Sequence, residues 1–294
     1  MVGGLAVYSA IPADPELTLP EVLPAIQAAG VASAAGGAPL AAGVPLSSVP
    51  QLSSLPNAFA KLYLDFDGDS RSSWGSYQPG NTPAFDTDGD ATTYSASELS
   101  AIQEIWSRVA EKYSPFNIDV TTINPGNINN LQTLQVVIGG TGSWYGAVAG
   151  GVAYVDSFSS PGSSTGVNVV YIFSKNLGGG AAKYVAEATA HEAGHAFGLE
   201  HQSVWSGGLK INEYNQGDSL RAPIMGTSYY AARGLWWYGT SSDPGGPLQD
   251  DMAVIASPTN GFGYRADDHS DVAGSPTPLS AHSRFRLPAV RCRR

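Results

Sequence analysis

Apolar side chains alternate with polar ones, or recur at helical spacing, along most of residues 58–264, and this pattern predicts one folded domain. The alternation at residues 61–66 predicts a strand. Ser95 and Glu98 form a capping box, the apolar residues after them follow one helical face, and Pro115 ends the pattern. We therefore expect a strand followed by a long helix.

Four further runs predict more strands. The β-branched runs 118–122 and 134–138 follow the helix, and a strand, a helix and a strand at this spacing imply a parallel crossover. Residues 151–158 form a short run flanked by glycine, which is typical of a sheet edge. Residues 167–173 are nearly all apolar, which is typical of a central strand. The sequence predicts a mostly parallel sheet.

Both ends of the chain lack such patterns. Residues 1–57 are rich in Ala, Gly, Pro and Ser, so we expect either a low-complexity leader or pro-segment, or a plain linker. Prolines interrupt its uncharged stretch too often for a transmembrane segment, and no secretory signal is recognisable. Residues 265–294 predict an irregular C-terminal tail.

Composition narrows the class of protein. Glycine (35) and proline (20) are frequent, and charged residues make up only 14% against about 25% in average proteins, which favours a loop-rich, extracellular protein. The net charge of −10 argues against nucleic acid as a partner. Because Cys292 is the only cysteine, a metal ion would need histidine and carboxylate ligands.

The candidate chemistry lies in a second predicted helix, in the segment HEAGHAFGLEH at residues 191–201. His191 and His195 are four residues apart, so both rings lie on one helical face, close enough to bind one zinc ion. Gly198 permits the left-handed backbone that ends the helix and returns His201 to the same metal. Three imidazoles leave one coordination position open for water, which is typical of catalytic zinc sites.

This segment resembles the extended motif HExxHxxGxxH of the metzincin zinc endopeptidases at every specified position. Residues 222–226, Ala-Pro-Ile-Met-Gly, resemble the methionine turn that lies beneath the zinc in that clan, with Met225 as the supporting methionine. The resemblance covers residues 58–264 in organisation. It implies an α+β fold: a twisted, mostly parallel five-stranded sheet with an antiparallel edge strand, a backing helix, an active-site helix, and a C-terminal helix beginning near Gln249.

The amino-acid sequence is most similar to those of secreted bacterial matrixin-like or reprolysin-like metzincins. This resemblance implies a secreted protein. No subfamily is assigned, because Gln202 follows the third histidine, where matrixins have Ser, adamalysins have Asp and astacins have Glu. Thr227 also replaces the tyrosine that some families place two residues after the methionine. Tyr229 or Tyr230 is therefore a candidate for stabilising a transition state, without an assignment as a metal ligand.

The resemblance implies hydrolysis of polypeptides. One bound Zn²⁺ would lower the pKa of a water molecule to about 7 and polarise the scissile carbonyl. Glu192 would act as general base towards that water and then as general acid towards the leaving amine. An extended substrate would pair with the unpaired edge of the strand that contains Gly151, Ala153 and Tyr154.

Other residues have two open interpretations. Trp236 and Trp237 would either wall a substrate pocket or belong to the core. Two runs of alternating aspartates indicate either calcium ligands or ordinary Asx-turns and helix caps, and neither run fits the EF-hand spacing. These residues are Asp65, Asp67, Asp69, Asp86, Asp88 and Asp90.

The leading hypothesis is a monomeric, zinc-dependent endopeptidase. Two other classes stay open: a surface or adhesion protein of the same fold that binds zinc with little or no turnover, and a zinc hydrolase acting on a bond other than a peptide. The presence of Glu192 argues against the adhesion protein, because a protein without catalysis is free to lose its base.

Overall fold

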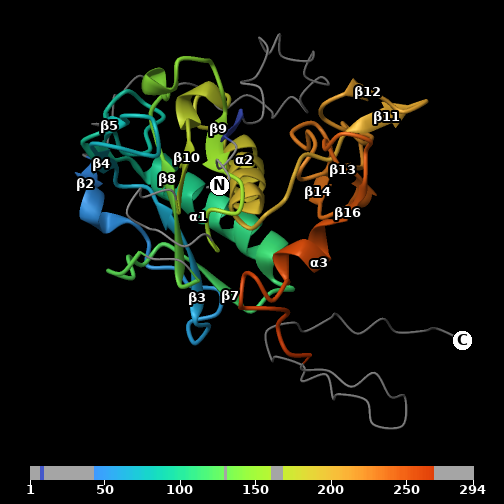
Figure 1. The fold of residues 1–294 in the computed structure, drawn as a ribbon. Coiled ribbons are helices and arrows are strands. Elements are labelled where there is room, and N and C mark those ends of the chain that lie inside the picture. Colours follow the sequence, from blue (N-terminus) through green and yellow to red (C-terminus); the bar gives the residue numbers. More distant parts are fainter. Residues whose placement is uncertain (1–6, 10–42, 129–130, 160–167, 268–294) are drawn as a thin grey trace, which may run out of the picture.

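The computed structural model describes residues 7–9, 43–128, 131–159 and 168–267. A six-stranded sheet, in the order β1-β9-β10-β8-β3-β7, lies beside two long helices (Figure 1). Strands β10, β8, β3 and β7 are parallel, whereas β9 is antiparallel to β10 and β1 is antiparallel to β9. The strands are β1 (Val7–Ser9), β3 (Ala60–Asp65), β7 (Ile118–Thr121), β8 (Thr133–Ile138), β9 (Gly151–Tyr154) and β10 (Val169–Ile172).

The sheet and its backing helix follow the predicted pattern. Helix α1 (Ala96–Tyr113) begins at Ser95, and the capping box between Ser95 and Glu98 is present in both directions. Strand β3 precedes this helix in sequence and β7 follows it, and the two strands pair in parallel. The predicted crossover is therefore confirmed. The expected run 151–158 is a strand only as far as Tyr154, after which the chain turns. The protein is therefore a mixed α/β structure with a mostly parallel sheet.

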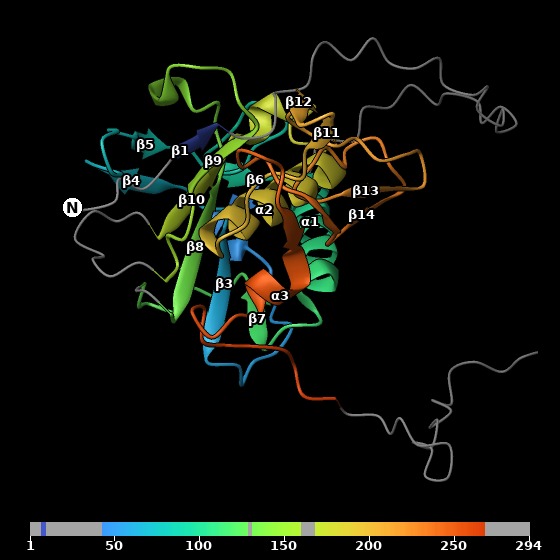
Figure 2. The same cartoon turned by 45° about the vertical axis from the view of Figure 1, so that its right-hand side comes forward.

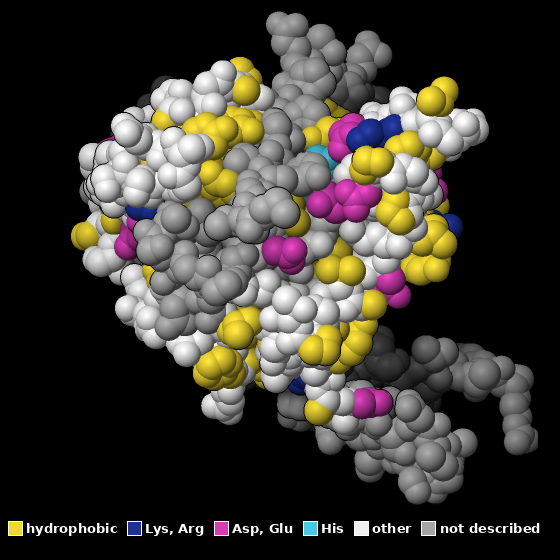
Figure 3. All heavy atoms as spheres, in the orientation of Figure 1, with side chains coloured by type: hydrophobic (Ala, Val, Ile, Leu, Met, Phe, Trp, Pro, Cys, Tyr) yellow, Lys and Arg dark blue, Asp and Glu magenta, His cyan; other side chains and the backbone are white. Residues whose placement is uncertain are grey.

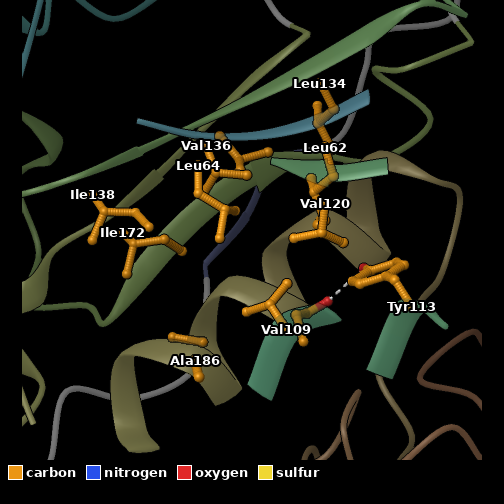
Figure 4. Packing of buried hydrophobic residues seen from close by; sticks show 14 of the residues in the cluster. Leu62, Leu64, Val109, Tyr113, Val120, Leu134, Val136, Ile138, Ile172 and Ala186 are labelled. Carbon is orange, nitrogen blue, oxygen red and sulfur yellow. Dashed lines mark hydrogen bonds between the residues drawn. The ribbon is translucent and has the colours of Figure 1, made fainter. Parts of the chain in front are cut away.

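Helices α1 and α2 (Ala182–Ala196) cover one face of the sheet. Apolar side chains of the strands and of both helices interdigitate there, as Figure 4 shows for Leu62, Val109 and Val136. The hydroxyl group of Tyr113 donates a 3.0 Å hydrogen bond to the carbonyl of Ala190, which ties α1 to α2 inside this core. The active-site segment predicted by the sequence is thus part of the most buried helix.

A cluster of aromatic residues covers the opposite face of the sheet. Alternate residues of β10 serve the two faces: Val170 and Ile172 face the helices, whereas Val169 and Tyr171 face this cluster. Trp74 lies at its centre, and its indole nitrogen donates a 2.7 Å hydrogen bond to the carbonyl of Val169. The cluster lies near the hairpin of β4 (Asp69–Arg71) and β5 (Gly80–Thr82).

The C-terminal part consists of short paired strands and a short helix, on the far side of α2 from the sheet (Figure 2). Its elements are β11 (Val204–Ser206), β12 (Leu209–Asn212), β13 (Arg221–Pro223), β14 (Arg233–Leu235), β15 (Tyr238–Thr240), β16 (Leu248–Asp250) and α3 (Asp251–Ile255). The expected C-terminal helix is present but begins two residues after Gln249, because the side chain of Asp250 caps it by accepting from the amide of Ala253.

The N-terminal boundary differs from the expectation. Residues 43–57, predicted as part of a leader, contribute β2 (Val44–Pro45), which pairs with β6 (Thr93–Tyr94), and a short 3₁₀ turn. The amide of Leu52 donates a 2.9 Å hydrogen bond to Thr122 Oγ1 beside β7. Packed structure therefore begins before residue 58, because backbone pairing compensates for a weak apolar pattern.

Strand β1 lies within the predicted leader. Residues 1–6 and 10–42 of that leader, and residues 268–294 with Cys292, lie outside the described residues. In the predicted tail, the amide of Arg265 donates a 2.8 Å hydrogen bond to the carbonyl of Pro115. No helix in the described part of the chain is both long and apolar enough to cross a bilayer.

Candidate metal centre

Helix α2 and the turn after it bring three histidines together. The ring centroids of His191 and His195 are 4.8 Å apart, and the ring of His201 lies 5.3 Å from the first and 4.8 Å from the second. One nitrogen of each ring lies within 4.8 Å of the others, so the group could bind a metal ion. A histidine side chain is visible at the surface, beside acidic and basic side chains (Figure 3).

The turn that returns His201 depends on Gly198. This glycine has a φ of +99°, and a Cβ at its position would lie 2.5 Å from Asp156 Oδ1. Its amide donates a 2.8 Å hydrogen bond to the carbonyl of His195, and the amide of Leu199 donates one of 3.0 Å to the carbonyl of Gly194. The left-handed helix end predicted at Gly198 is confirmed, and only glycine fits there without strain.

Each histidine has a hydrogen-bond partner at Nδ1. The acceptors are the carbonyl of Ile224 for His191, at 2.7 Å, and the carbonyl of Leu199 for His195, at 2.6 Å. A carbonyl only accepts, so Nδ1 carries the proton and Nε2 keeps its lone pair. The Nε2 atom of His191 has no hydrogen-bond partner among the described residues, as expected of an atom reserved for a metal ion.

Burial also favours the ligand form of these two rings. His191 and His195 are completely buried, and burial lowers the pKa of each imidazole well below its usual range, with a further contribution from the neighbouring histidines. A neutral imidazole is the form that coordinates a metal ion. The positions of the rings and the neutral form of His191 and His195 therefore both suit metal coordination.

The side chain of His201 bonds differently. Its Nδ1 lies 2.6 Å from Oε1 of Glu213, a carboxylate that follows β12. The hydrogen bond with His201 and the ammonium group of Lys210 lower the pKa of Glu213 to about 2. The ring of Tyr214 lies 4.5 Å from that of His201, centroid to centroid.

Glu192 lies beside the three histidines in sequence and is completely buried. Neither carboxylate oxygen has a hydrogen-bond partner among the described residues, and burial raises the pKa of this group well above its usual range. A Cβ added to Gly151 would lie 2.8 Å from Cγ of Glu192, so the start of β9 contacts this side chain. A buried carboxylate without partners is costly, which makes Glu192 a candidate functional residue.

Met225 lies directly against the metal-site helix. A Cβ added to Gly194, between the two helical histidines, would lie 2.6 Å from Sδ of Met225. The amide of Gln202 donates a 2.8 Å hydrogen bond to the carbonyl of Met225, which connects this segment to the residue after His201. The fully buried Met225 thus packs against the turn of α2 between His191 and His195, and its role beneath a metal ion stays a prediction.

The strand expected to bind substrate is not a free edge. Gly151 of β9 contacts Glu192, but Ala153 is buried in the core and the ring of Tyr154 lies 4.5 Å from that of Trp74 on the other face. The outer side of β9 pairs with β1, in the register Val7 with Tyr154 and Ser9 with Val152. The expectation of an unpaired β9 is therefore wrong for residues 152–154, because a segment far away in sequence occupies that side.

Of the two tryptophans, Trp236 packs against the core. The indole of Trp236 lies 5.2 Å from the ring of Tyr113 and donates a 2.7 Å hydrogen bond to the carbonyl of Lys112. The same indole lines a cavity of about 200 Å³ with Lys112 and Glu187. The amide of Trp237 donates a 2.9 Å hydrogen bond to Asp251 Oδ2. For Trp236, the core interpretation therefore agrees better with the contacts.

Of the two candidate tyrosines, Tyr229 is buried and Tyr230 is exposed. The hydroxyl group of Tyr229 has no hydrogen-bond partner among the described residues. Burial, and next the charge of Glu192, raise the pKa of that hydroxyl group well above its usual range.

None of Asp65, Asp67 and Asp69 belongs to a group of described residues that could bind a metal ion. Burial raises the pKa of Asp65 to about 8, and Asp69 pairs with Arg71 at 3.0 Å. Asp90 accepts from the amide and hydroxyl groups of Thr92.

A second group that could bind a metal ion consists of Asp86, Asp88 and Glu98. Protein groups already contact all three carboxylates: Lys175 pairs with Asp86 at 2.5 Å, the amide of Asp90 donates a 3.0 Å hydrogen bond to Asp88, and the oxygens of Glu98 accept from Ser95 and Thr87. These contacts are those of an ion pair, a turn and a helix cap, and they leave the calcium interpretation a prediction.

Sequence reasoning missed Glu213 and Tyr214. Glu213 lies twelve residues after His201 and outside the motif. Only the return of the chain through the hairpin of β11 and β12 brings it to the imidazole. Hydrophobic periodicity does not predict such a contact. The only sequence signal was that a glutamate and a tyrosine follow the third histidine within a short distance.

We compared the chain with protein-family models, curated proteins and solved structures, and none of the three comparisons found a match.

Proposed function

We propose that this protein is a zinc-dependent endopeptidase of the metzincin type. One observation carries the proposal: a cluster of three imidazoles beside a completely buried glutamate that has no hydrogen-bond partner among the described residues. A structural role explains neither the convergence of three rings nor the burial of an unpaired carboxylate.

The donor set fits zinc. His191, His195 and His201 offer three nitrogens, the ligand number of catalytic zinc sites, and a tetrahedral ion keeps a fourth position open. Imidazole ligands also suit copper, iron and nickel, so the preference for zinc rests on the combination with Glu192 and on the resemblance of the motif.

When bound, zinc supplies a water of lowered pKa and polarises the scissile carbonyl. Glu192 takes the proton of the attacking water on a carboxylate oxygen and delivers it to the leaving amine. Burial favours the protonated form of Glu192, whereas a nearby cation favours the ionised form that acts as a base. The same side chain is thereby suited to accept and to release a proton.

The neighbours of Glu192 serve orientation. Gly151 brings the backbone of β9 against Glu192, because any larger side chain would meet its Cγ. An extended polypeptide alongside that backbone would place a peptide bond near the metal centre. The hydroxyl group of Tyr229 is a candidate donor to a developing oxyanion.

Digestion of a denatured protein and of a peptide library by the zinc-loaded full chain tests this function. Wild type should cleave internal peptide bonds, whereas Glu192→Gln should keep its zinc and lose at least about 100-fold in turnover. Glu104→Gln, on the exposed side of α1, is the matched control and should cleave like wild type. Zinc binding without cleavage by wild type would favour the adhesion protein, and cleavage of esters alone would favour a different hydrolase.

A further inference from the structure

The three histidines differ in what accepts the proton at Nδ1. Backbone carbonyls accept from His191 and His195, and both carbonyls belong to segments packed against α2. His201 instead contacts a side chain, the Oε1 atom of Glu213, at 2.6 Å. A charged acceptor forms a stronger hydrogen bond than a carbonyl and raises the basicity of the ring as a ligand.

Glu213 is itself oriented by a closed circuit of contacts. The ammonium group of Lys210 lies 2.5 Å from Oε2 of Glu213 and donates a 3.1 Å hydrogen bond to the carbonyl of Ser242. The amide of Ser242 donates a 2.9 Å hydrogen bond to the carbonyl of His201. The circuit therefore begins and ends at the same histidine.

The backbone around Glu213 is also anchored. Ser203 Oγ donates a 2.5 Å hydrogen bond to the carbonyl of Glu213, and the amide of Asn215 donates one of 2.7 Å to the carbonyl of Gln202. These bonds link the end of the β11–β12 hairpin to the two residues after His201. The position of the carboxylate is thus set by the hairpin and not by α2.

We propose that Glu213 is a positioning residue that fixes the tautomer and the orientation of His201, so that the third metal ligand depends on the β11–β12 hairpin. Because the carboxylate accepts at Nδ1, the Nε2 lone pair of His201 faces the other two ligands. This inference rests on the proposed function only in requiring that the three histidines bind zinc.

The exposure of the pair makes the inference testable by substitution. The side chain of His201 is 2% exposed, whereas that of Glu213 is 36% exposed. Replacing Glu213 opens no cavity in the core, so the variants should fold.

The test is the zinc affinity of the full chain, measured by competition with a chelating dye, for wild type, Glu213→Ala, Glu213→Gln and the control Glu104→Gln. Glu213→Ala should bind zinc about 10- to 100-fold more weakly, as found for supporting groups of metal ligands. Glu213→Gln keeps one acceptor oxygen and should lose less. Glu104→Gln, with a similarly exposed glutamate, should bind like wild type.

Two further readouts separate positioning from a merely structural role. The visible spectrum of bound Co²⁺ should change in Glu213→Ala, because the orientation of one ligand changes. At saturating zinc, kcat should fall while the KM for a peptide stays near that of wild type, because Glu213 touches the ligand and not the substrate.

Equal zinc affinity and an unchanged Co²⁺ spectrum in Glu213→Ala would overturn the inference while leaving the zinc centre intact. Failure of wild type to bind zinc would overturn the proposed function, and this inference with it. If Glu213→Ala does not fold, Glu213→Gln decides, since it preserves the size of the side chain.

Discussion

The two sides of the candidate metal centre are built in different ways. On the sheet side, His191 and His195 lie on α2 inside the main core, and backbone carbonyls orient their rings. On the hairpin side, His201 lies after a glycine turn and depends on Glu213, a partly exposed side chain. The first pair is positioned by helix packing, and the third ligand by a local network of polar contacts.

The sequence encodes the positions of the three histidines in two ways. A spacing of four residues fixes the first pair as soon as the helix forms, because a helix places such residues on one face. The third ligand needs the turn at Gly198 and the return of the chain through β11 and β12. Perturbations on the sheet side should therefore change stability, and those on the hairpin side should mainly change metal affinity.

The largest expected effect comes from removing one ligand on each side. His195→Ala and His201→Ala should both lose stoichiometric zinc, because each removes one of three ligands. In the metal-free protein, His195→Ala should lower the free energy of unfolding by about 3 kcal/mol, because it leaves a cavity and the carbonyl of Leu199 without a donor. His201→Ala should cost about 1 kcal/mol, because Glu213 stays solvated and paired with Lys210.

Zinc content by elemental analysis and urea unfolding of the metal-free variants check this pair of values. Equal losses of unfolding free energy would remove the distinction between the two sides. Retention of one tightly bound zinc by His201→Ala would contradict the assignment of three ligands.

The second prediction concerns a buried ion pair on the sheet side. Lys112 Nζ lies 2.9 Å from Oε1 of Glu187, and both side chains are mostly buried. Lys112→Met should lower the free energy of unfolding by about 3–5 kcal/mol, because it leaves a buried carboxylate without its cation.

Zinc affinity should stay near that of wild type in Lys112→Met if it folds, since the hydrogen bonds and the ion pair of Lys112 and Glu187 go to other residues than the three histidines. The matched control is Arg108→Met, which removes an exposed ion pair from the same helix and should cost at most about 1 kcal/mol. Similar unfolding midpoints for the two variants would contradict the prediction.

A third, smaller effect tests the contact between α2 and Met225. A change from glycine to alanine inside a helix normally stabilises it by about 1 kcal/mol. Gly194→Ala should instead destabilise the protein by about 1–3 kcal/mol, because the new Cβ would lie 2.6 Å from Met225 Sδ. Thermal unfolding measures the sign, and the cost should shrink when Met225→Ala is combined with it. A stabilising Gly194→Ala would show that the packing is loose.

The smallest expected effect concerns β1 on the outer side of β9. Because Val7–Ser9 pairs with Val152–Tyr154, an extended substrate cannot pair with the same backbone groups at the same time. Deleting residues 1–42 removes β1 but keeps residues 43–57, and it should raise kcat/KM for peptides several-fold. Steady-state kinetics of the zinc-loaded full chain and of the zinc-loaded deletion variant measure this effect. Identical values of kcat/KM would show that β1 does not compete with substrate.

The sequence predicted the sheet side well. The alternation at residues 61–66, the capping box at Ser95 and the β-branched runs all became elements of the expected type, because local propensity and burial favour the same structure. The left-handed turn at Gly198 was also predictable, since few other residues adopt that backbone.

The contacts that were missed join segments far apart in sequence. Strand β1 pairs with β9 across about 145 residues, and Glu213 reaches His201 only after a hairpin has formed. Residues 43–57 form backbone bonds to β7 with no regular apolar pattern of their own. Such pairings depend on the whole fold, so neither residue spacing nor hydrophobic periodicity predicts them.

Anomalous diffraction at the zinc edge, from crystals of the zinc-loaded protein, decides whether the three histidines bind zinc. One peak is expected at about 2.0–2.1 Å from a ring nitrogen of each of His191, His195 and His201, the usual distance for zinc and imidazole. Absence of a peak among these three rings, or a peak at Asp86, Asp88 and Glu98 instead, would contradict it.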